Sequence, residues 1–444
     1  MAENGEKTQA DFIIERIKER PVNKKKLLQR TIITISLAGV FGLVACLTFL
    51  LLQPVLSNLL YPEQEPETVY FPEETDEMLP EEMIIEDDTS NADLQETVES
   101  VLAQGGKIEE VLSKWVLNRN NYYQLYNAMN NYTKELYRAM VTVTGVTSDR
   151  DWLNNTIENS MQVSGTVIAN NGVEFLILAD STLLEGADSI WVTFYNKRKA
   201  EASVKQKDAA TGLAVFAVPL DTVPEEMWGL VEIAPLGTSS TAVAVGNPVV
   251  AMGSPMGVTG SIQYGMITAS DVKWETIDAN YKLFYTDMFG CDTSSGAIFN
   301  LQGQIIGVIT PDKAGEDKGA FLSAIGIAEL RNAITRMCNG NPEPYVGIRG
   351  ISVTTEANVT DGVPFGAYVR EVEMESPAML AGIQSGDIIV NVGVLPISSF
   401  EDYSNVIAKT KPGQVLKIVV KRQVQDGYKD VMFQVTVSGQ VLNK

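Results

Sequence analysis

The hydrophobic pattern begins with one long uncharged run, Thr31–Leu52, which follows a polar N-terminal tail at residues 1–30. As a helix, a run of this length measures about 33 Å, enough to cross the hydrocarbon core of a bilayer. The basic cluster Lys24–Lys26 precedes the run, and no Lys or Arg lies between Gln53 and Gly106. By the positive-inside rule, we expect residues 31–52 to form a single-pass membrane helix with a cytoplasmic N-terminus and all later residues outside.

A second interpretation of the same run starts from Leu43-Val44-Ala45-Cys46, which is similar to a bacterial lipobox. Cleavage at such a site leaves a lipidated cysteine at the new N-terminus. The apolar run continues beyond Cys46 through Leu47–Leu52, and the basic region before it is long for a signal peptide. We therefore favour the membrane helix, with lipidation of Cys46 as the alternative.

The segment after the apolar run changes character twice. Residues 53–106 are acidic and interrupted by proline, which predicts an extended, self-repelling linker. Residues 107–138 show a helical spacing of apolar positions, with an interruption expected at Asn118–Asn121. The tyrosines of this segment are expected to pack on the following domain, or alternatively between protomers: Tyr122, Tyr123, Tyr126, Tyr132 and Tyr137.

From residue 139 the pattern changes to short apolar runs separated by Gly, Asn and Asp turns. This spacing predicts an all-β barrel or sandwich over residues 139–338, ending in a helix at Ile325–Met337. The strands expected from the apolar runs are Met140–Thr144, Gly165–Ala169, Phe175–Leu178, Ser189–Tyr195, Ala214–Val218 and Pro248–Met252.

A second β-rich unit is expected over residues 344–440. Ser376 before Pro377 predicts a helix N-cap with proline in the first turn, and Gly382 predicts the left-handed end of that helix. Ser398–Glu401 fits a capping box for a second helix. That helix is expected from Phe400 to Thr410, and the strands that close the unit are expected at Val415–Lys421 and Val431–Val437.

Composition narrows the classes of function. The chain has 444 residues, which predicts two or three domains, and a formal net charge of −22, which argues against nucleic-acid binding. Three cysteines, Cys46, Cys291 and Cys338, are too few for a disulfide scaffold. The chain has no histidine, and its acidic residues show no metal-ligand spacing, so we expect neither a metal site nor a cofactor.

The stretch with the clearest chemistry is Asp292-Thr293-Ser294-Ser295-Gly296-Ala297, a small-residue turn that runs into an apolar strand. It resembles the loop Gly-Asn-Ser-Gly-Gly-Pro of the HtrA family of trypsin-like serine proteases. The resemblance places Ser294 at the nucleophile position, Thr182 at the position of the catalytic histidine and Gly212 at that of the catalytic aspartate. It implies two six-stranded β-barrels, at residues 139–235 and 236–338.

The same resemblance implies that catalysis is lost. A serine hydroxyl is a poor nucleophile until a neighbouring base takes its proton, and Thr182 and Gly212 supply neither the base nor its orienting carboxylate. In this family the oxyanion hole uses the N–H groups of Ser294 and of the residue two before it, normally a glycine. That residue is Asp292, whose carboxylate would repel a developing oxyanion.

Two other catalytic arrangements remain as alternatives. Lys205 or Lys207, with Asp208 nearby, could act as the base for Ser294, because lysine replaces histidine in some serine hydrolases. Cys291 could act as the nucleophile, but it meets the same absence of a base. We expect Cys291 to be a small, half-buried residue instead.

The unit at residues 344–440 resembles a PDZ domain, and its place after a protease-like body is the HtrA arrangement. In this family the loop Tyr345-Val346-Gly347-Ile348 offers backbone N–H groups to the terminal carboxylate of a peptide. The strand Ile348–Val353 would accept the peptide as an added strand beside the helix from Phe400. The alternative is a docking module that contacts only its own protease-like body.

Together the resemblances imply an all-β double β-barrel of the trypsin type, then an α+β PDZ domain. The hydropathy and charge pattern adds an N-terminal transmembrane helix and a helical stalk before them. We expect a pseudoprotease of the bacterial cell membrane whose outer domains bind unfolded or C-terminal polypeptide segments in envelope protein quality control. The family suggests homotrimers. The alternatives are an active endopeptidase that uses Ser294 with an unrecognised base, and a regulatory subunit that assembles with an active HtrA relative.

Overall fold

We describe the fold from a computed structural model in which the described residues are 35–39, 41–44, 48, 66–71, 119–150, 156–237, 240–311, 321–425 and 427–439. By its contacts the chain divides into two units, Met1–Glu65 and Pro66–Lys444. The tail at 1–30, Cys46, residues 107–118 and most of the expected membrane helix and acidic linker lie outside the described residues. Within the described ranges, no helix is both long enough and apolar enough to cross a membrane.

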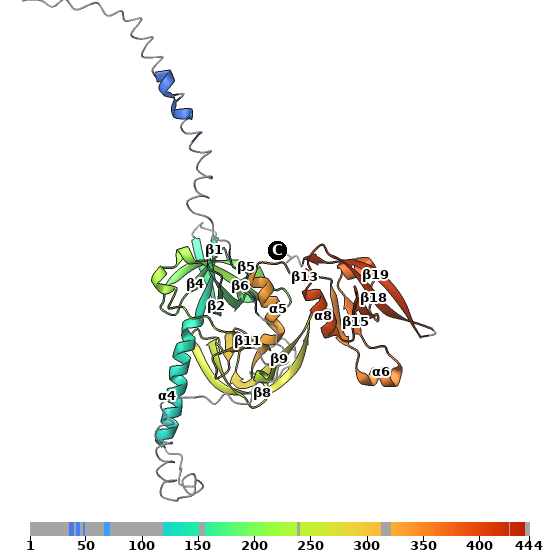
Figure 1. Ribbon diagram of the computed structural model, residues 1–444. Coiled ribbons are helices and arrows are strands. Elements are labelled where there is room, and N and C mark those ends of the chain that lie inside the picture. The colour runs from blue at the N-terminus through green and yellow to red at the C-terminus, as the bar shows by residue number, and fades with distance from the viewer. Residues whose placement is uncertain are drawn as a thin grey trace, which may run out of the picture. The chain divides into compact units, whose positions relative to one another are not determined.

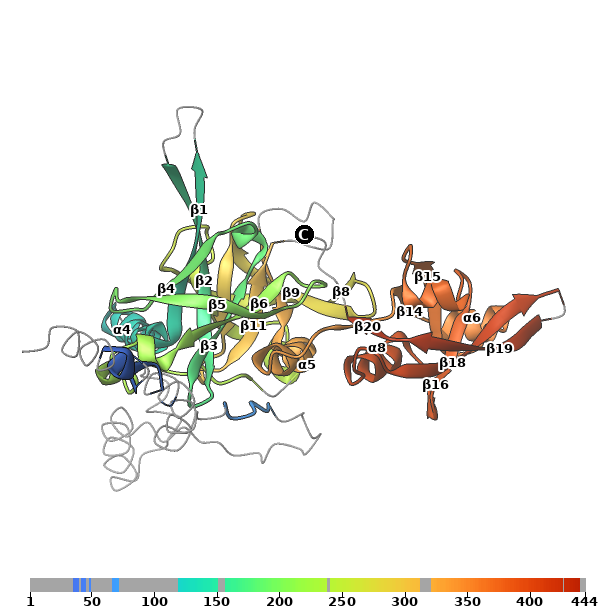
Figure 2. The same cartoon turned by 90° about the horizontal axis from the view of Figure 1, so that it is seen from above.

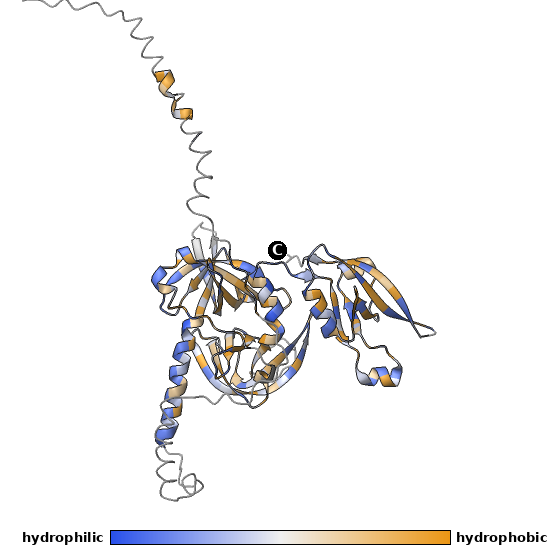
Figure 3. Ribbon diagram, viewed as in Figure 1, coloured by the Kyte–Doolittle hydropathy of each residue, from blue (hydrophilic) through white to orange (hydrophobic). Residues whose placement is uncertain are grey.

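The helical segment before the barrels contains α4 (Arg119–Leu136), which leads into the short 3-10 turn η1 (Tyr137–Ala139). Asn120 and Asn121 lie in the first turn of α4, so the expected interruption is wrong for these two residues. Asparagine is a weak helix former, but it is tolerated in a first turn, where the backbone N–H groups have no partner within the helix. Figure 3, coloured by residue hydropathy, shows that α4 is largely hydrophilic.

Only the C-terminal half of α4 packs on the barrels. Met129, Tyr132 and Leu136 contact the core between the barrels, as does Tyr137. The Tyr132 hydroxyl donates a hydrogen bond to the carbonyl of Asn300. The expectation that the tyrosines pack on the body is therefore correct for two of them and wrong for the three that precede Met129, which are 50% to 64% exposed: Tyr122, Tyr123 and Tyr126.

The first half of the body is a closed barrel with the strand order β1-β2-β3-β6-β5-β4 (Figure 1). Beyond the barrel, β1 and β2 continue as a two-stranded ribbon (Figure 2). Short 3-10 turns follow β3, at η2 (Thr182–Leu184), and β6, at η3 (Leu220–Thr222) and η4 (Glu225–Met227). The strands are β1 (Met140–Arg150), β2 (Thr156–Asn170), β3 (Glu174–Asp180), β4 (Ser189–Thr193), β5 (Lys199–Lys207) and β6 (Leu213–Pro219).

The second half is also a closed barrel, with the order β10-β11-β12-β9-β8-β7. It begins after the 3-10 turn η5 (Ser240–Val243). The trypsin-type pair of barrels expected from the sequence is therefore confirmed. The strands are β7 (Pro248–Ser254), β8 (Ser261–Glu275), β9 (Asn280–Phe289), β10 (Ser295–Phe299), β11 (Ile305–Thr310) and β12 (Phe321–Gly326).

Strands β3 and β6 are buried along almost their whole length because each faces a core on both sides. Successive side chains of a strand point to opposite faces. Phe175 and Ile177 fill the interior of the first barrel, whereas Leu176 and Leu178 pack in the core between the two barrels. This arrangement explains why the sequence of β3 is a continuous apolar run and not an alternating one.

Helix α5 (Ile327–Cys338) closes the body and touches both barrels. Its buried side chains Leu330, Ile334 and Met337 recur at the spacing of one helix face and enter the core between the barrels. The sequence-based prediction of a terminal helix at this position is confirmed, with a start two residues later than expected.

The C-terminal unit has the expected PDZ fold. Its sheet has the order β14-β15-β16-β18-β19, and the pair β13–β20 closes the unit. Strand β14 lies at one edge, with β15 as its sheet neighbour. The elements are β13 (Pro344–Tyr345), β14 (Ile348–Ser352), α6 (Thr355–Asp361), β15 (Ala367–Val372), α7 (Pro377–Ala381), β16 (Ile388–Val392), β17 (Leu395–Pro396), α8 (Phe400–Ala408), β18 (Val415–Val424), β19 (Gly427–Thr436) and β20 (Ser438–Gly439).

The helix signals of this unit are correct with one shift. The Ser376 side chain accepts a hydrogen bond from the N–H of Met379, and Gly382 ends α7 in the left-handed region. The capping box of α8 is formed by Ser399 and Asp402, one residue later than the Ser398–Glu401 pair expected from the sequence. Asp402 also accepts a hydrogen bond from the hydroxyl of Ser398, so its carboxylate is hydrogen-bonded to both serines.

Candidate functional site

The Ser294 hydroxyl lies at the end of the loop between β9 and β10, and only 3% of the residue is exposed. It donates a hydrogen bond to the backbone carbonyl of Pro255 at 2.6 Å and accepts one from the N–H of Cys291 at 2.8 Å. A peptide carbonyl cannot take the proton of an attacking serine, so this hydroxyl is held by a structural partner instead of a general base.

The loop around Ser294 also uses the backbone group that an oxyanion hole requires. The N–H of Ser294 donates to the carbonyl of Cys291 at 2.9 Å, which closes a tight turn over residues 291–294. A hole donor must point at the space where the oxyanion develops, and a donor already bound within its own turn does not. Asp292, at the second donor position, lies exposed within this turn.

The positions assigned to the catalytic histidine and aspartate lie next to each other. Thr182 begins η2 directly after β3, and its N–H donates to the carboxylate of Asp180 at 2.8 Å. A Cβ atom added to Gly212 would lie 2.6 Å from Oγ1 of Thr182. The structure therefore brings Thr182 and Gly212 together, while the hydrogen bonds of Ser294 go to Pro255 and Cys291.

Gly212 has a backbone φ of +81°, in the left-handed region that disfavours most side chains. A glycine here lets the chain turn tightly between Asp208 and β6, since the N–H of Gly212 donates to the carbonyl of Asp208. The residue at the aspartate position is thus adapted to a turn conformation as well as lacking a carboxylate.

Three buried serines connect the two barrels, one of them next to Ser294 in the chain, and the sequence did not single them out. Ser295 accepts a hydrogen bond from the N–H of Ser164 at 3.0 Å, and the hydroxyls of Ser164 and Ser254 are 2.8 Å apart. Ser164 belongs to the first barrel and the other two to the second. A run of small polar residues near a predicted strand end was the available signal, but it does not distinguish an interdomain contact from an ordinary turn.

Lys205 and Asp208, two residues of the alternative Ser–Lys arrangement, have structural partners elsewhere. Lys205 forms an ion pair with Glu174, and burial lowers the pKa of its ammonium group. Asp208 is 2% exposed, accepts hydrogen bonds from the hydroxyl and N–H of Thr211, and forms an ion pair with Arg336 of α5. These contacts place Lys205 and Asp208 in the packing of β5 against its neighbours.

Glu343 lies beside the Asp208–Arg336 pair, in the segment that joins α5 to the PDZ unit. Its carboxylate accepts a hydrogen bond from the N–H of Ala209 at 2.9 Å. Burial, and then the neighbouring charge of Asp208, raise the pKa of Glu343 to about 8. One arginine therefore lies near two carboxyl groups, the buried Asp208 and the half-buried Glu343, and the sequence did not reveal this cluster because Asp208 lies 128 residues before Arg336.

Cys291 is exposed, which corrects the expectation that it is half-buried. It lies at the start of the tight turn that ends at Ser294, so its side chain is displaced toward solvent. The hydrogen bond with the hydroxyl of Thr293 lowers the pKa of the Cys291 thiol. Cys338 is buried at the end of α5, and both cysteines are free thiols.

The loop predicted to bind a carboxylate in the PDZ unit directs three backbone N–H groups at one side chain of the body. The N–H groups of Val346, Gly347 and Ile348 converge on one point, and each donates to the carboxylate of Asp278 in the turn between β8 and β9. Tyr345 differs from the other three predicted residues, because it lies in β13 and pairs with Ser438 of β20. Three of the four predicted residues are therefore carboxylate donors in this structure.

Comparisons with known proteins agree with this organisation. The sequence profile of the trypsin-like peptidase domain matches residues 163–308, and that of the PDZ domain matches residues 344–437. The serine endoprotease DegS of Salmonella typhimurium is 28% identical over 304 residues, which cover 64% of this chain and 80% of that protein. The serine protease Do-like HtrA of Lactobacillus helveticus is 25% identical over 290 residues, which cover 62% of this chain and 68% of that protein.

The chain is HtrA-like. Among solved structures, the HtrA-type protease AlgW with a decapeptide superposes with a TM-score of 0.50 at 22% identity, covering 70% of this chain and 99% of that one. This likeness supports the fold described above, two closed barrels followed by a PDZ domain. The chain spans only 53% to 63% of the length of several other relatives, so their activities do not transfer to it directly.

Proposed function

We propose that this HtrA-like chain is a catalytically inert, membrane-tethered protein that binds polypeptide C-termini through its PDZ domain. The observation that carries the proposal is the hydrogen-bonding of Ser294, whose hydroxyl donates to the carbonyl of Pro255 and whose N–H donates to that of Cys291. Among the residues that the structure describes, the nucleophile position thus has no proton acceptor suited to catalysis, and its own oxyanion donor is occupied.

The binding half of the proposal rests on the PDZ loop. Three convergent backbone N–H groups form a site suited to a carboxylate, and β14 beside it is an edge strand that can accept an extended peptide. The HtrA-type protease AlgW was solved with a decapeptide, which is consistent with peptide recognition in proteins of this fold. A role in quality control of envelope proteins, and assembly as a trimer or with an active HtrA relative, belong to the same proposal.

A fluorophosphonate probe tests the loss of activity, because it reacts covalently with activated serine nucleophiles. We expect the purified chain to label no more strongly than its Ser294→Ala variant, while an active HtrA protease labels in parallel. Labelling that disappears in Ser294→Ala would instead show an active endopeptidase with a base other than histidine.

The tether is tested separately by the accessibility of the chain in intact cells. The charge asymmetry around Thr31–Leu52 predicts that protease added outside removes the barrels and the PDZ domain and leaves the N-terminal tail intact. Immunoblotting with tags at the two ends measures both outcomes. Protection of the C-terminal tag in intact cells, with cleavage after permeabilisation, would contradict the proposed topology.

A further inference from the structure

The carboxylate-binding loop of the PDZ domain already holds a carboxylate from the protease-like body. Asp278 lies in the four-residue turn between β8 and β9, and only 7% of it is exposed. Its Oδ2 accepts hydrogen bonds from the N–H groups of Val346 and Gly347, both at 2.7 Å, and its Oδ1 accepts one from Ile348 at 3.0 Å. The hydroxyl of Tyr403 on α8 donates to Oδ1 at 2.7 Å.

The backbone of the β8–β9 turn also makes one hydrogen bond of the kind that a strand added to β14 would make. The N–H of Asp278 donates to the carbonyl of Ile348 at 2.7 Å, next to the carboxylate contact. Two residues along the same edge, the side-chain amide of Asn280 donates to the carbonyl of Gly350 at 2.9 Å. A peptide added to β14 would need these two outward-facing carbonyls, because alternate residues of an edge strand face the incoming strand.

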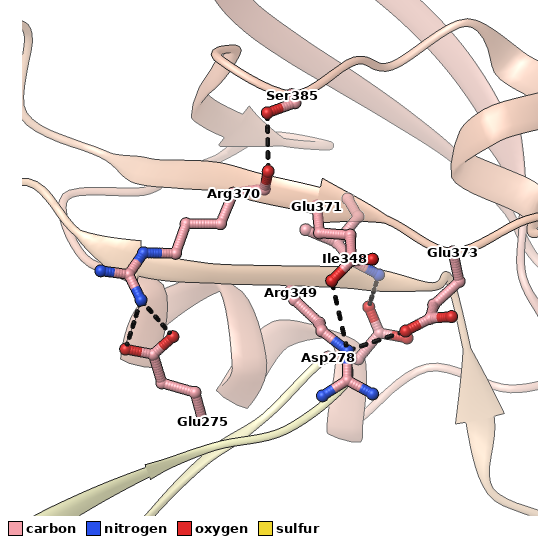
Figure 4. Close-up of polar contacts among 8 residues, drawn as sticks. All are labelled: Glu275, Asp278, Ile348, Arg349, Arg370, Glu371, Glu373 and Ser385. Atoms are coloured by element: carbon pink, nitrogen blue, oxygen red, sulfur yellow. Dashed lines mark hydrogen bonds and ion pairs between the residues drawn. The ribbon is translucent and has the colours of Figure 1, made fainter.

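Ion pairs lie on either side of the occupied loop, as Figure 4 shows. Glu275, at the end of β8, accepts two hydrogen bonds from Arg370 of β15, at 2.9 and 3.1 Å. Within the PDZ domain, Arg349 pairs with Glu373 at 2.7 Å. The Glu275–Arg370 pair joins the same hairpin to the same domain as Asp278 does, so the turn is held at two points.

A buried carboxylate must be compensated by hydrogen bonds or opposite charge. The four hydrogen bonds described for the Asp278 carboxylate all come from the PDZ domain: Val346, Gly347, Ile348 and Tyr403. Within the described part of the chain, this carboxylate therefore has no hydrogen-bond donor from the body. What the carboxylate matches is the chemistry of a polypeptide C-terminus.

We propose that Asp278 is an internal ligand of the PDZ domain, and that a polypeptide with a free C-terminal carboxylate binds by displacing the β8–β9 turn from the loop Val346–Ile348 and the edge of β14. This inference rests on the proposed peptide-binding function. A peptide can bind only the fraction of molecules in which the turn has left, so the internal ligand weakens the apparent affinity by that fraction. Only polypeptides whose C-termini bind tightly, or are present at high concentration, would therefore displace the turn.

The test compares peptide binding by the full-length chain in detergent with that of an Asp278→Gly variant. Asp278 has a φ of +58°, which glycine adopts without strain, so the turn is preserved while the carboxylate is lost. The probe is a library of fluorescein-labelled random decapeptides with free C-termini, and the same library amidated serves as the ligand control. We expect the apparent affinity for the free-carboxylate library to rise at least about tenfold, with little change for the amidated library.

Asp271 provides a matched control in the same hairpin. It also has a left-handed backbone, with a φ of +59°, but its side chain is exposed and contacts Ser270 and Lys282 of the body. Asp271→Gly is expected to leave peptide affinity unchanged. A second variant, Asp278→Asn, keeps the shape of the side chain but puts an amide group against the N–H donors, and it should raise affinity in the same direction as Asp278→Gly.

Hydrogen exchange of the loop amides gives a readout that needs no peptide. The amides of Val346, Gly347 and Ile348 are expected to be protected in the unmodified chain and in Asp271→Gly, and to exchange faster in Asp278→Gly. Equal peptide affinity in the unmodified chain and both Asp278 variants would overturn the internal ligand and leave peptide binding intact. Binding of neither library by any of the proteins would instead overturn the proposed peptide-binding function itself.

Discussion

Installing the two missing triad residues, Thr182→His with Gly212→Asp, is expected to leave casein hydrolysis at background. In serine proteases, removal of triad residues lowers the rate by about 10⁴ to 10⁶-fold, so a restored triad should be easy to detect if the rest of the site were ready. We expect no such gain, because the loop that carries Ser294 is not in a catalytic arrangement.

The reason lies in the hydrogen bonds of Ser294. The Ser294 hydroxyl donates to the carbonyl of Pro255, and its N–H donates to that of Cys291, so neither is directed at a substrate. An aspartate at position 212 would have to adopt a φ of +81°, at a cost on the order of 1 kcal/mol. The fold can tolerate that cost, which makes the loop and not the triad the limiting defect.

Rebuilding the loop should therefore have the larger effect. Adding Asp292→Gly, Thr293→Asn and Ser295→Gly to the double variant is expected to bring a measurable rise in casein cleavage, since a formed oxyanion hole contributes about 3–4 kcal/mol to transition-state stabilisation. The matched control carries the same five changes with Ser294→Ala. Activity at the level of an HtrA protease from the double variant alone would contradict the role given to the loop, and a folded but silent complete set would contradict the assignment of the triad positions.

Arg336→Ala is expected to destabilise the body by about 3–5 kcal/mol, because it removes the partner of a buried charge. The Asp208 carboxylate is 2% exposed and would keep only the hydrogen bonds from Thr211. Glu343, whose pKa is raised to about 8 by burial and by Asp208, would lose the same neighbouring cation. Urea unfolding followed by tryptophan fluorescence measures the change.

A surface ion pair supplies the control for this prediction. Arg138 lies 3.5 Å from Glu232, and the two side chains are 48% and 55% exposed. Arg138→Ala should change the free energy of unfolding by less than about 1 kcal/mol, as is typical of solvated pairs. A similar small effect for Arg336→Ala would mean that water replaces the guanidinium, and that the buried cluster does not hold α5 to the first barrel.

Much of the fold could be predicted because its signals are local. The periodicity of short apolar runs locates strands such as β3 and β6, and the pair Ser376–Pro377 and the single residue Gly382 mark the two ends of α7. Where a local signal has two equivalent readings, the prediction shifts: Ser398 and Ser399 are neighbours, and only the structure shows that Ser399 caps α8. The exposed part of α4 illustrates a second limit of prediction from local signals. Tyrosines at helical spacing do not show how much of the helix the barrels will cover.

The sequence by itself determined the order of the domains, the positions assigned to the triad and the absence of a histidine to act as base. It also located the loop Val346–Ile348, through the resemblance of Tyr345-Val346-Gly347-Ile348 to the carboxylate-binding loop of the HtrA family. Tertiary structure alone decided what fills that loop. Asp278 lies 68 to 70 residues before its three backbone partners, and in the sequence it is an ordinary aspartate in a hairpin turn. Ser294 and Asp208 each have one partner that is likewise distant in the chain, Pro255 and Arg336 respectively. Such contacts arise only when the barrels close and the PDZ domain meets the body, so no pattern within one segment can carry them.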